Sequence, residues 1–242
     1  MALHFLVATA TDAAVGDVVS LTGAEAKHAA VVRRLRVGET ITLGDGAGVW
    51  LSGVTEAVSP AQVEVRISER TVQQGAKPRV ILVQALAKRD RDELAVQAAC
   101  ELGVDEVVPW QASRSVSRWE GAKALKGRER WSSIVREAAK QAHRAWIPLV
   151  EVPVTTGQLA ERAGGERMLV LDPGASQRLT DIEPDGRDIV LVVGPEGGIA
   201  PEELARLTAA GAERVLLGDT VLRTSTAGPA AIAVLSASLG RW

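Results

Sequence analysis

From Pro78 to the end of the chain, short apolar runs alternate with segments that have a helical pattern. Near-continuous apolar strands that alternate with helices are typical of a parallel sheet covered on both faces. The pattern predicts helices over residues 91–103, 123–143, 201–211 and 226–239, and strands over residues 79–87, 106–110, 148–152, 167–172, 188–194 and 214–218. We therefore expect an α/β domain over residues 76–242.

The first 75 residues have a different pattern. Residues 39–54 are two alternating apolar runs on either side of Gly-Asp-Gly-Ala-Gly, which is a hairpin signal, and residues 61–68 alternate again. One helix interrupts the strands: Thr22 and Glu25 have the spacing of a capping box, and the helix is expected to run to about Arg34. Several short strands with one helix favour a small β-barrel domain over residues 1–75.

The composition excludes several classes of protein. The chain has 242 residues, a formal net charge of −2 and one cysteine, Cys100, so no intramolecular disulfide framework or multi-cysteine metal site can form. The three histidines, His4, His28 and His143, lie far apart in the sequence, and we expect no metal site. There is no signal-peptide pattern, and no segment approaches the roughly 20 apolar residues of a membrane span. We therefore expect a soluble, cytoplasmic protein that binds no membrane.

Charge is unevenly distributed along the predicted α/β domain. Residues 112–146 carry nine Lys or Arg against three Glu, whereas residues 172–213 carry nine Asp or Glu against three Arg. The basic stretch also holds Trp119, Trp131 and Trp146, whose rings could stack on bases. A solvated helix face with tryptophans in the core would explain the basic stretch as well. The two opposite fields in one domain instead favour a polyanion as partner on one side.

Residues 191–204, LVVGPEGGIAPEEL, predict a strand, a glycine turn and the start of a helix. In an open α/β sheet, ligands bind beyond the carboxyl ends of the strands. Gly194, Gly197 and Gly198 would let the backbone turn sharply and come close to a ligand. A glycine-rich turn that binds no ligand is the alternative.

The charges of this segment argue against a phosphate ligand. Its glycine spacing does not match a dinucleotide or P-loop motif. Glu196 lies in the turn, and Glu202 and Glu203 lie in the first helical turn, where a phosphate would need bare N–H groups. Carboxylates repel a pyrophosphate but do not repel a ligand that carries a positive sulfonium and an adenosine.

A second loop follows the next predicted strand, in residues 217–235, LGDTVLRTSTAGPAAIAVL. Thr224, Ser225 and Thr226 are three possible caps for one helix, so spare hydroxyls and Arg223 remain at the same edge of the sheet. A capped core helix with a surface arginine would explain the same residues. Close packing of another element on this helix is implied by its small residues, Ala227, Gly228, Ala230 and Ala231.

Together, GPEGG and LGDTVLRTSTA resemble the SPOUT class of S-adenosylmethionine-dependent RNA methyltransferases. Within that class the chain resembles the ribosomal RNA small-subunit methyltransferase E family, which methylates N3 of a uridine in 16S rRNA. Residues 28–48 resemble the family's N-terminal PUA-like RNA-binding domain, and residues 99–116 and 136–148 resemble its central segments. The chain departs from the family at Ser225, where the family usually has Glu, and at Gly228-Pro229 in the helix start.

The resemblance implies a fold, a cofactor and partners. The fold is α/β, with a C-terminal SPOUT domain whose mostly parallel sheet is trefoil-knotted, preceded by a small PUA-like β-barrel domain. The implied partners are 16S rRNA or the small ribosomal subunit and a second copy of the chain in a homodimer, with no metal. The implied cofactor is S-adenosyl-L-methionine, and its predicted contacts are Leu171, Gly194, Pro195, Glu196, Gly197, Gly198, Leu217, Gly218, Leu222, Arg223, Thr224, Thr226 and Ala227.

Candidate residues for catalysis and RNA binding follow from the chemistry and position of their side chains. We expect Arg223, with Arg114 or Arg144 from the other subunit, to stabilise charge on the uracil, and Glu196 is the candidate proton acceptor. The predicted RNA-binding residues are His28, Arg33, Arg34, Arg36, Arg114 and Arg118. For the arginines that follow His28, a helix whose arginines are only solvated is the alternative.

Two other functions remain open beside an RNA methyltransferase. A non-enzymatic RNA-binding factor in ribosome assembly would use the small β domain and the basic stretch, but it leaves the two C-terminal loops without a purpose. A nucleotide-binding oxidoreductase would use the glycine loops, but the acidic residues in them count against a dinucleotide.

Overall fold

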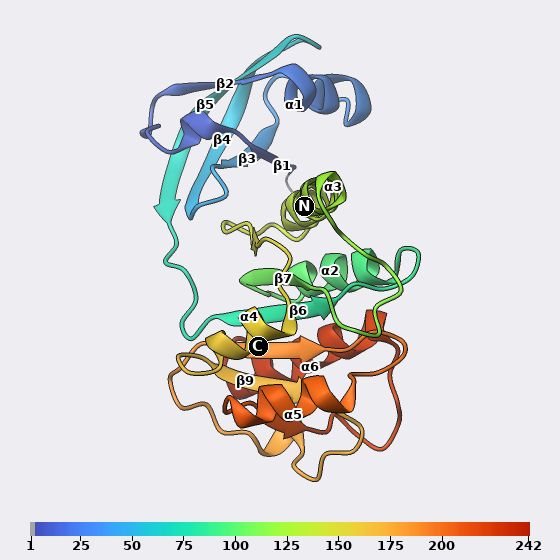
Figure 1. The fold of residues 1–242 in the computed structure, drawn as a ribbon. Helices are drawn as coiled ribbons and strands as arrows, with labels where there is room; N and C mark the ends of the chain where they lie inside the picture. The colour runs from blue at the N-terminus through green and yellow to red at the C-terminus, as the bar shows by residue number, and fades with distance from the viewer. Residues whose placement is uncertain (1–2) are drawn as a thin grey trace. The chain divides into compact units, whose positions relative to one another are not determined.

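The computed structural model describes residues 3–242, and the chain divides into two compact units (Figure 1). The first unit comprises the chain up to Gly75 together with residues 139–147, and the second comprises residues 76–138 and 148–242. Residues 139–147 join the first unit through backbone pairing. The amide of Gly48 donates to the carbonyl of Ala145 at 3.0 Å, and the amide of Ile147 donates to that of Gly46 at 2.9 Å.

The first unit is built on a five-stranded sheet with the order β1-β3-β4-β5-β2. The predicted hairpin is confirmed, since β3 and β4 pair antiparallel around residues 45–48. Alternate residues of these strands are buried in one core, including Phe5, Leu21, Ile41, Leu43 and Leu51. The strands are β1 (His4–Leu6), β2 (Val18–Thr22), β3 (Thr40–Gly44), β4 (Val49–Val58) and β5 (Gln62–Val72), with a 3-10 turn η1 (Ala8–Ala10) after β1.

The helix of this unit differs from the prediction. It consists of α1 (Gly23–Lys27) and a π-helical turn η2 (His28–Val32). The predicted capping box is wrong, because the side chain of Thr22 makes no capping hydrogen bond. Glu25 is engaged elsewhere: its Oε1 accepts from Nζ of Lys140, a residue of the same unit, at 2.8 Å. A long-range ion pair has therefore replaced a local cap.

The second unit contains a six-stranded sheet with the order β11-β9-β10-β6-β7-β8, in which every strand pair is parallel. The predicted α/β class and the parallel sheet are confirmed. All six predicted strands are present, most of them shorter than expected, as β6 (Val80–Ala85), β7 (Glu106–Trp110), β8 (Leu149–Val150), β9 (Arg167–Leu171), β10 (Ile189–Val193) and β11 (Glu213–Val215).

Helices cover both faces of this sheet (Figure 1). On one face α6 packs on β10, β6 and α2, and on the other α4 packs on α5. Leu159 of α4 and Leu207 of α5 share a core with Ile81 and Val83 of β6. The helices are α2 (Arg91–Glu101), α3 (Ala122–Gln141), α4 (Thr156–Arg162), α5 (Pro201–Ala209) and α6 (Thr224–Ser238), of which α4 was not predicted.

The segment after β11 lies against the connection between β9 and β10. Leu216 donates its amide to the carbonyl of Gln177 at 2.7 Å and accepts from the amide of Leu179 at 2.8 Å. The 3-10 turn η3 (Leu179–Asp181) of that connection contacts α6. The trefoil knot that the resemblance implies stays a prediction.

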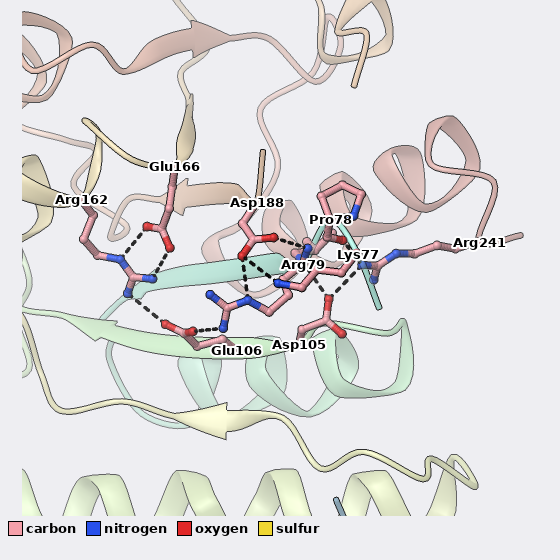
Figure 2. A network of polar contacts seen from close by, with 10 residues as sticks. Lys77, Pro78, Arg79, Asp105, Glu106, Arg162, Glu166, Asp188 and Arg241 are labelled. Atoms are coloured by element: carbon pink, nitrogen blue, oxygen red, sulfur yellow. Dashed lines mark hydrogen bonds and ion pairs between the residues drawn. The ribbon is translucent and has the colours of Figure 1, made fainter. Parts of the chain in front are cut away.

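Ion pairs gather at the amino ends of the central strands (Figure 2). Arg79 binds Asp188 at 2.8 Å and Glu106 at 3.1 Å. Arg241, after α6, binds Asp105 at 2.9 Å and thereby fixes the end of the chain to the start of β7. This charged network lies at the edge of the sheet opposite to the edge where parallel sheets bind ligands.

In the part of the chain that the structure describes, no helix is both long and apolar enough to cross a membrane.

Candidate functional site

A cavity of about 510 Å³ lies at the carboxyl edge of the parallel sheet. Its walls come from the loops that follow β9, β10 and β11, which are residues 171–173, 194–199 and 216–224. Most of the lining side chains are apolar, and the volume falls within the roughly 300–1,000 Å³ of small-molecule sites. The cavity lies where the sheet topology and the two loop motifs predicted a ligand site.

The structure brings most of the predicted cofactor contacts together in this cavity. Gly197 and Thr226 do not line it, and a Cβ atom on Gly197 would meet Cβ of Arg114 at 3.4 Å. The predicted contacts that do line it are Leu171, Gly194, Pro195, Glu196, Gly198, Leu217, Gly218, Leu222, Arg223, Thr224 and Ala227.

The hydroxyl of Thr224 bonds to the ends of two strands and does not cap α6. The N-cap of α6 is Arg223, and no side chain caps the helix, so the prediction of a Thr or Ser cap is wrong. The buried hydroxyl of Thr224 donates to the carbonyl of Gly194 at 2.8 Å and accepts from Nε2 of Gln84 at 2.9 Å. One hydroxyl thus joins the start of α6 to the ends of β10 and β6.

The predicted close packing on α6 is confirmed at Gly228. A Cβ atom there would lie 2.9 Å from Cδ1 of Leu82 and 3.4 Å from Cγ2 of Val193. The helix therefore lies directly on β6 and β10, and its first turn reaches the cavity through Thr224 and Ala227.

Glu196 forms part of the cavity wall together with Arg91. Its Oε1 accepts from the backbone amide of Lys88 at 3.1 Å and from Nη1 of Arg91 at 3.3 Å. Arg91, like Asp172, was not predicted as a site residue. Their position in the sequence could have identified them, because each residue lies at or after the carboxyl end of a predicted parallel strand, where ligands bind.

Arg114 was predicted to act from the other subunit, but it lies next to the predicted cofactor loop, residues 194–199, of its own chain. Its Nη1 donates to the carbonyl of Gly197 at 3.1 Å. Arg118, in the same loop, donates from Nη2 to the carbonyl of Ser113 at 3.0 Å. The loop after β7 therefore places the guanidinium group of Arg114 beside residues 194–199.

The other predicted residues belong to the first unit. Arg33, Arg34 and Arg36 are exposed just after η2, whereas the ring of His28 lies edge-on to Phe5 with centroids 6.1 Å apart. Arg144 lies in the segment 139–147 of that unit.

Two histidines that are distant in the sequence come together in the first unit. The rings of His4 and His143 lie 6.0 Å apart, and His4 stacks on Trp50 at 4.1 Å. Burial, and then the nearby His143 and Lys140, lower the pKa of His4 to about 4, so its imidazole is neutral at pH 7. Among residues 3–242, no group of three His, Cys, Asp or Glu side chains could hold a metal ion.

Known proteins share both units of the chain. A family model described as an RNA methyltransferase domain matches residues 75–236, and one described as an RNA methyltransferase PUA domain matches residues 21–68. The ribosomal RNA small subunit methyltransferase E of Mycobacterium bovis is 44% identical over all of this chain and 94% of its own length. The Bacillus subtilis protein of that name is 32% identical over 90% of this chain and 89% of its own length.

The chain belongs to the ribosomal RNA small subunit methyltransferase E family. Solved structures agree with this assignment. A putative methyltransferase of Legionella pneumophila with bound S-adenosylmethionine has a TM-score of 0.87 and 30% identity, with 98% of both chains covered. The methyltransferase E of Neisseria gonorrhoeae, bound to S-adenosyl methionine, has a TM-score of 0.87 and 28% identity, with 98% of both chains covered. The predicted family and its two-domain fold class are therefore confirmed.

We expect Thr224→Val to destabilise the second unit. The substitution keeps the shape of the side chain but removes its hydroxyl. The side-chain amide of Gln84 and the backbone carbonyl of Gly194 then each lose a hydrogen bond. Since an unsatisfied buried polar group costs about 1–3 kcal/mol, the free energy of unfolding should fall by about 2–4 kcal/mol. Thr224→Ser keeps the hydroxyl and is the matched control. Urea denaturation followed by circular dichroism measures both, and an unchanged midpoint for Thr224→Val would contradict the bridging role.

Proposed function

We propose that this protein transfers a methyl group from S-adenosylmethionine to N3 of a uridine in 16S rRNA. The observation that carries the proposal is the cavity at the carboxyl edge of the parallel sheet, walled by the three loops after β9, β10 and β11. The S-adenosylmethionine bound in the two related structures, and the names of the relatives, support the cofactor and the RNA substrate. N3 of uridine as the acceptor rests on the family resemblance.

The residues of the cavity fit this cofactor in chemistry. Apolar side chains such as Leu171, Ile199 and Leu222 suit an adenine ring. A Cβ placed on Gly218 would meet no atom within 4 Å beyond the glycine and its two chain neighbours. Gly198 has φ +71°, which places it in the left-handed region that favours glycine. The wall carries the carboxylates of Glu196 and Asp172, which pair with Arg91 and Arg214 respectively, and carboxylates suit a sulfonium better than a pyrophosphate.

The cofactor supplies an electrophilic methyl group on its sulfonium, and the chain supplies the remaining requirements. A base inside folded RNA is out of reach, so the uridine must leave its stack to enter the site. Its N3–H is a weak acid, and negative charge develops on the uracil oxygens as the proton leaves. A guanidinium that is already held next to those oxygens stabilises that charge without the energetic cost of reorienting solvent molecules.

We assign these roles to four residues. Arg223 lines the cavity and is the candidate for stabilising the uracil anion. Its partner is either Arg114, which we assign to the same chain because it contacts Gly197 there, or Arg144 from a second copy of the chain in a homodimer. Glu196 lies in the cavity wall and is the candidate proton acceptor.

Contacts with the RNA backbone are proposed for His28, Arg33, Arg34, Arg36, Arg114 and Arg118. The exposure of Arg33, Arg34 and Arg36 supports their role, since phosphate contacts need guanidinium groups that are free to reach the backbone.

A methyl-transfer assay tests the proposal. The protein is incubated with methyl-labelled S-adenosylmethionine and with 16S rRNA or small-subunit particles that lack the modification, and the RNA is digested to nucleosides for mass spectrometry. We expect N3-methyluridine. A label on another atom would overturn the N3 assignment, and RNA binding without transfer would favour the assembly-factor alternative.

Arg223→Ala should reduce the rate of methyl transfer by about 10²–10³, the typical effect of removing one donor that acts on transition-state charge. The affinity for S-adenosylmethionine should hardly change, because backbone and apolar groups of the loops carry it. Arg223→Lys should restore little activity, since an ammonium lacks the planar fork of a guanidinium.

Single-turnover methylation at saturating cofactor, beside calorimetric titration of the cofactor, separates these effects. Arg187→Ala is the matched control, because Arg187 pairs with Asp185 ahead of β10 at the opposite edge of the sheet. Equal losses of affinity and rate in Arg223→Ala would make Arg223 a cofactor-site or structural residue.

A further inference from the structure

The loop of residues 111–119 has no helix or strand of its own, yet one of its side chains contacts the loop of residues 194–199. It follows β7 and carries both Arg114 and Arg118. Arg114 reaches the cofactor loop by one hydrogen bond, from Nη1 to the carbonyl of Gly197 at 3.1 Å. A long side chain on an irregular loop keeps one position only if the loop itself is fixed.

The carboxylate of Glu203, in the first turn of α5, accepts hydrogen bonds from three separate segments. Its Oε1 accepts from the backbone amide of Ser113 at 3.0 Å and from the hydroxyl of Thr156 at 2.6 Å. Its Oε2 accepts from the hydroxyl of Ser113 at 2.8 Å and from the amide of Ala200 at 3.4 Å. Burial by itself would raise the pKa of Glu203, but the hydrogen bonds from Thr156, Ser113 and Ala200 lower it, so the group is ionised at pH 7.

Capping of α5 does not account for this arrangement. The contact with Ala200, the residue before the helix, is the longest of the four, and alanine offers no side-chain acceptor for the reciprocal half of a capping box. The three shorter bonds go to residues outside α5. Two of them go to Ser113, the residue that precedes Arg114.

We propose that Glu203 is a positioning residue, which anchors the loop of residues 111–119 through Ser113 and thereby holds Arg114 at the cofactor loop. Hydrogen bonds to an ionised carboxylate are about twice as strong as those between neutral groups, which suits an anchor for a loop without secondary structure. The consequence for methyl transfer rests on the proposed role of Arg114, whereas the anchoring of the loop does not.

Trypsin measures the anchoring directly, because it cleaves after Arg114 and Arg118. Glu203→Gln keeps the size of the side chain but removes its charge and turns one acceptor into a donor. We expect cleavage after these two arginines to become about 10-fold faster, since the open population of the loop sets the rate and a hydrogen bond to a charged group is weakened.

Glu202→Gln is the matched control, because Glu202 is exposed in the same helical turn. It should leave the cleavage rates at the wild-type value, and cleavage after Arg187 should be equal in all variants. Ser113→Ala removes a single bond to Glu203 and should accelerate the same two cuts, which keeps the test valid if Glu203→Gln unfolds. Unchanged cleavage after Arg114 and Arg118 in Ser113→Ala and in folded Glu203→Gln would overturn the proposal.

A double-mutant cycle then tests whether Glu203 acts through Arg114. Single-turnover rates are measured for Glu203→Gln, for Arg114→Ala and for the double variant. If Glu203 acts through Arg114, its substitution slows the wild-type enzyme but has no further effect on Arg114→Ala, whereas additive effects would contradict the proposal. No slowing in Arg114→Ala alone would refute the catalytic role of Arg114, and no transfer by the wild type would refute the proposed function. In either case the trypsin result still decides whether Glu203 anchors the loop.

Discussion

Parallel pairing of β11, β9 and β10 places the loops that follow these strands at one edge of the sheet. All three loops contribute walls to the same cavity, although they are separated along the chain by a long connection and by a helix. The helix α6 completes the arrangement, because Thr224 binds the end of β10 and Gly228 lets the helix lie on Leu82. The cavity therefore depends on a sheet topology that brings distant loops together and on one buried hydroxyl that holds α6 against it.

Arginines pair with carboxylates at both edges of the sheet. At the amino edge, Arg79 neutralises Asp188 and Glu106, and the network of Figure 2 joins charged groups to one another. At the carboxyl edge the acidic groups face different partners: Glu196 accepts from Arg91 in the cavity wall, and Glu203 accepts from the loop after β7. Glu196 and Glu203 look equivalent in the sequence, and their surroundings give them different proposed roles.

Sequence patterns over a few neighbouring residues predicted most of the secondary structure and of the cavity lining, because short-range interactions determine these features. The apolar periodicity gave six strands and four of the helices of the second unit, and the loop motifs identified most residues that line the cavity. Contacts between distant residues were missed. Glu25 has the spacing of a capping box but pairs with Lys140, and Thr224 looks like a helix cap but binds Gly194. In each case a partner distant in the sequence, 115 and 30 residues away respectively, offered a better interaction than the local one.

Hydrogen exchange with and without S-adenosylmethionine tests most directly whether the three loops form the cofactor site. The intact protein is followed by mass spectrometry of its peptides. We predict slower amide exchange in residues 171–173, 194–199 and 216–224 when the cofactor is added, with no change in the hairpin of β3 and β4. Cofactor binding that slows exchange in none of these three segments would contradict the account.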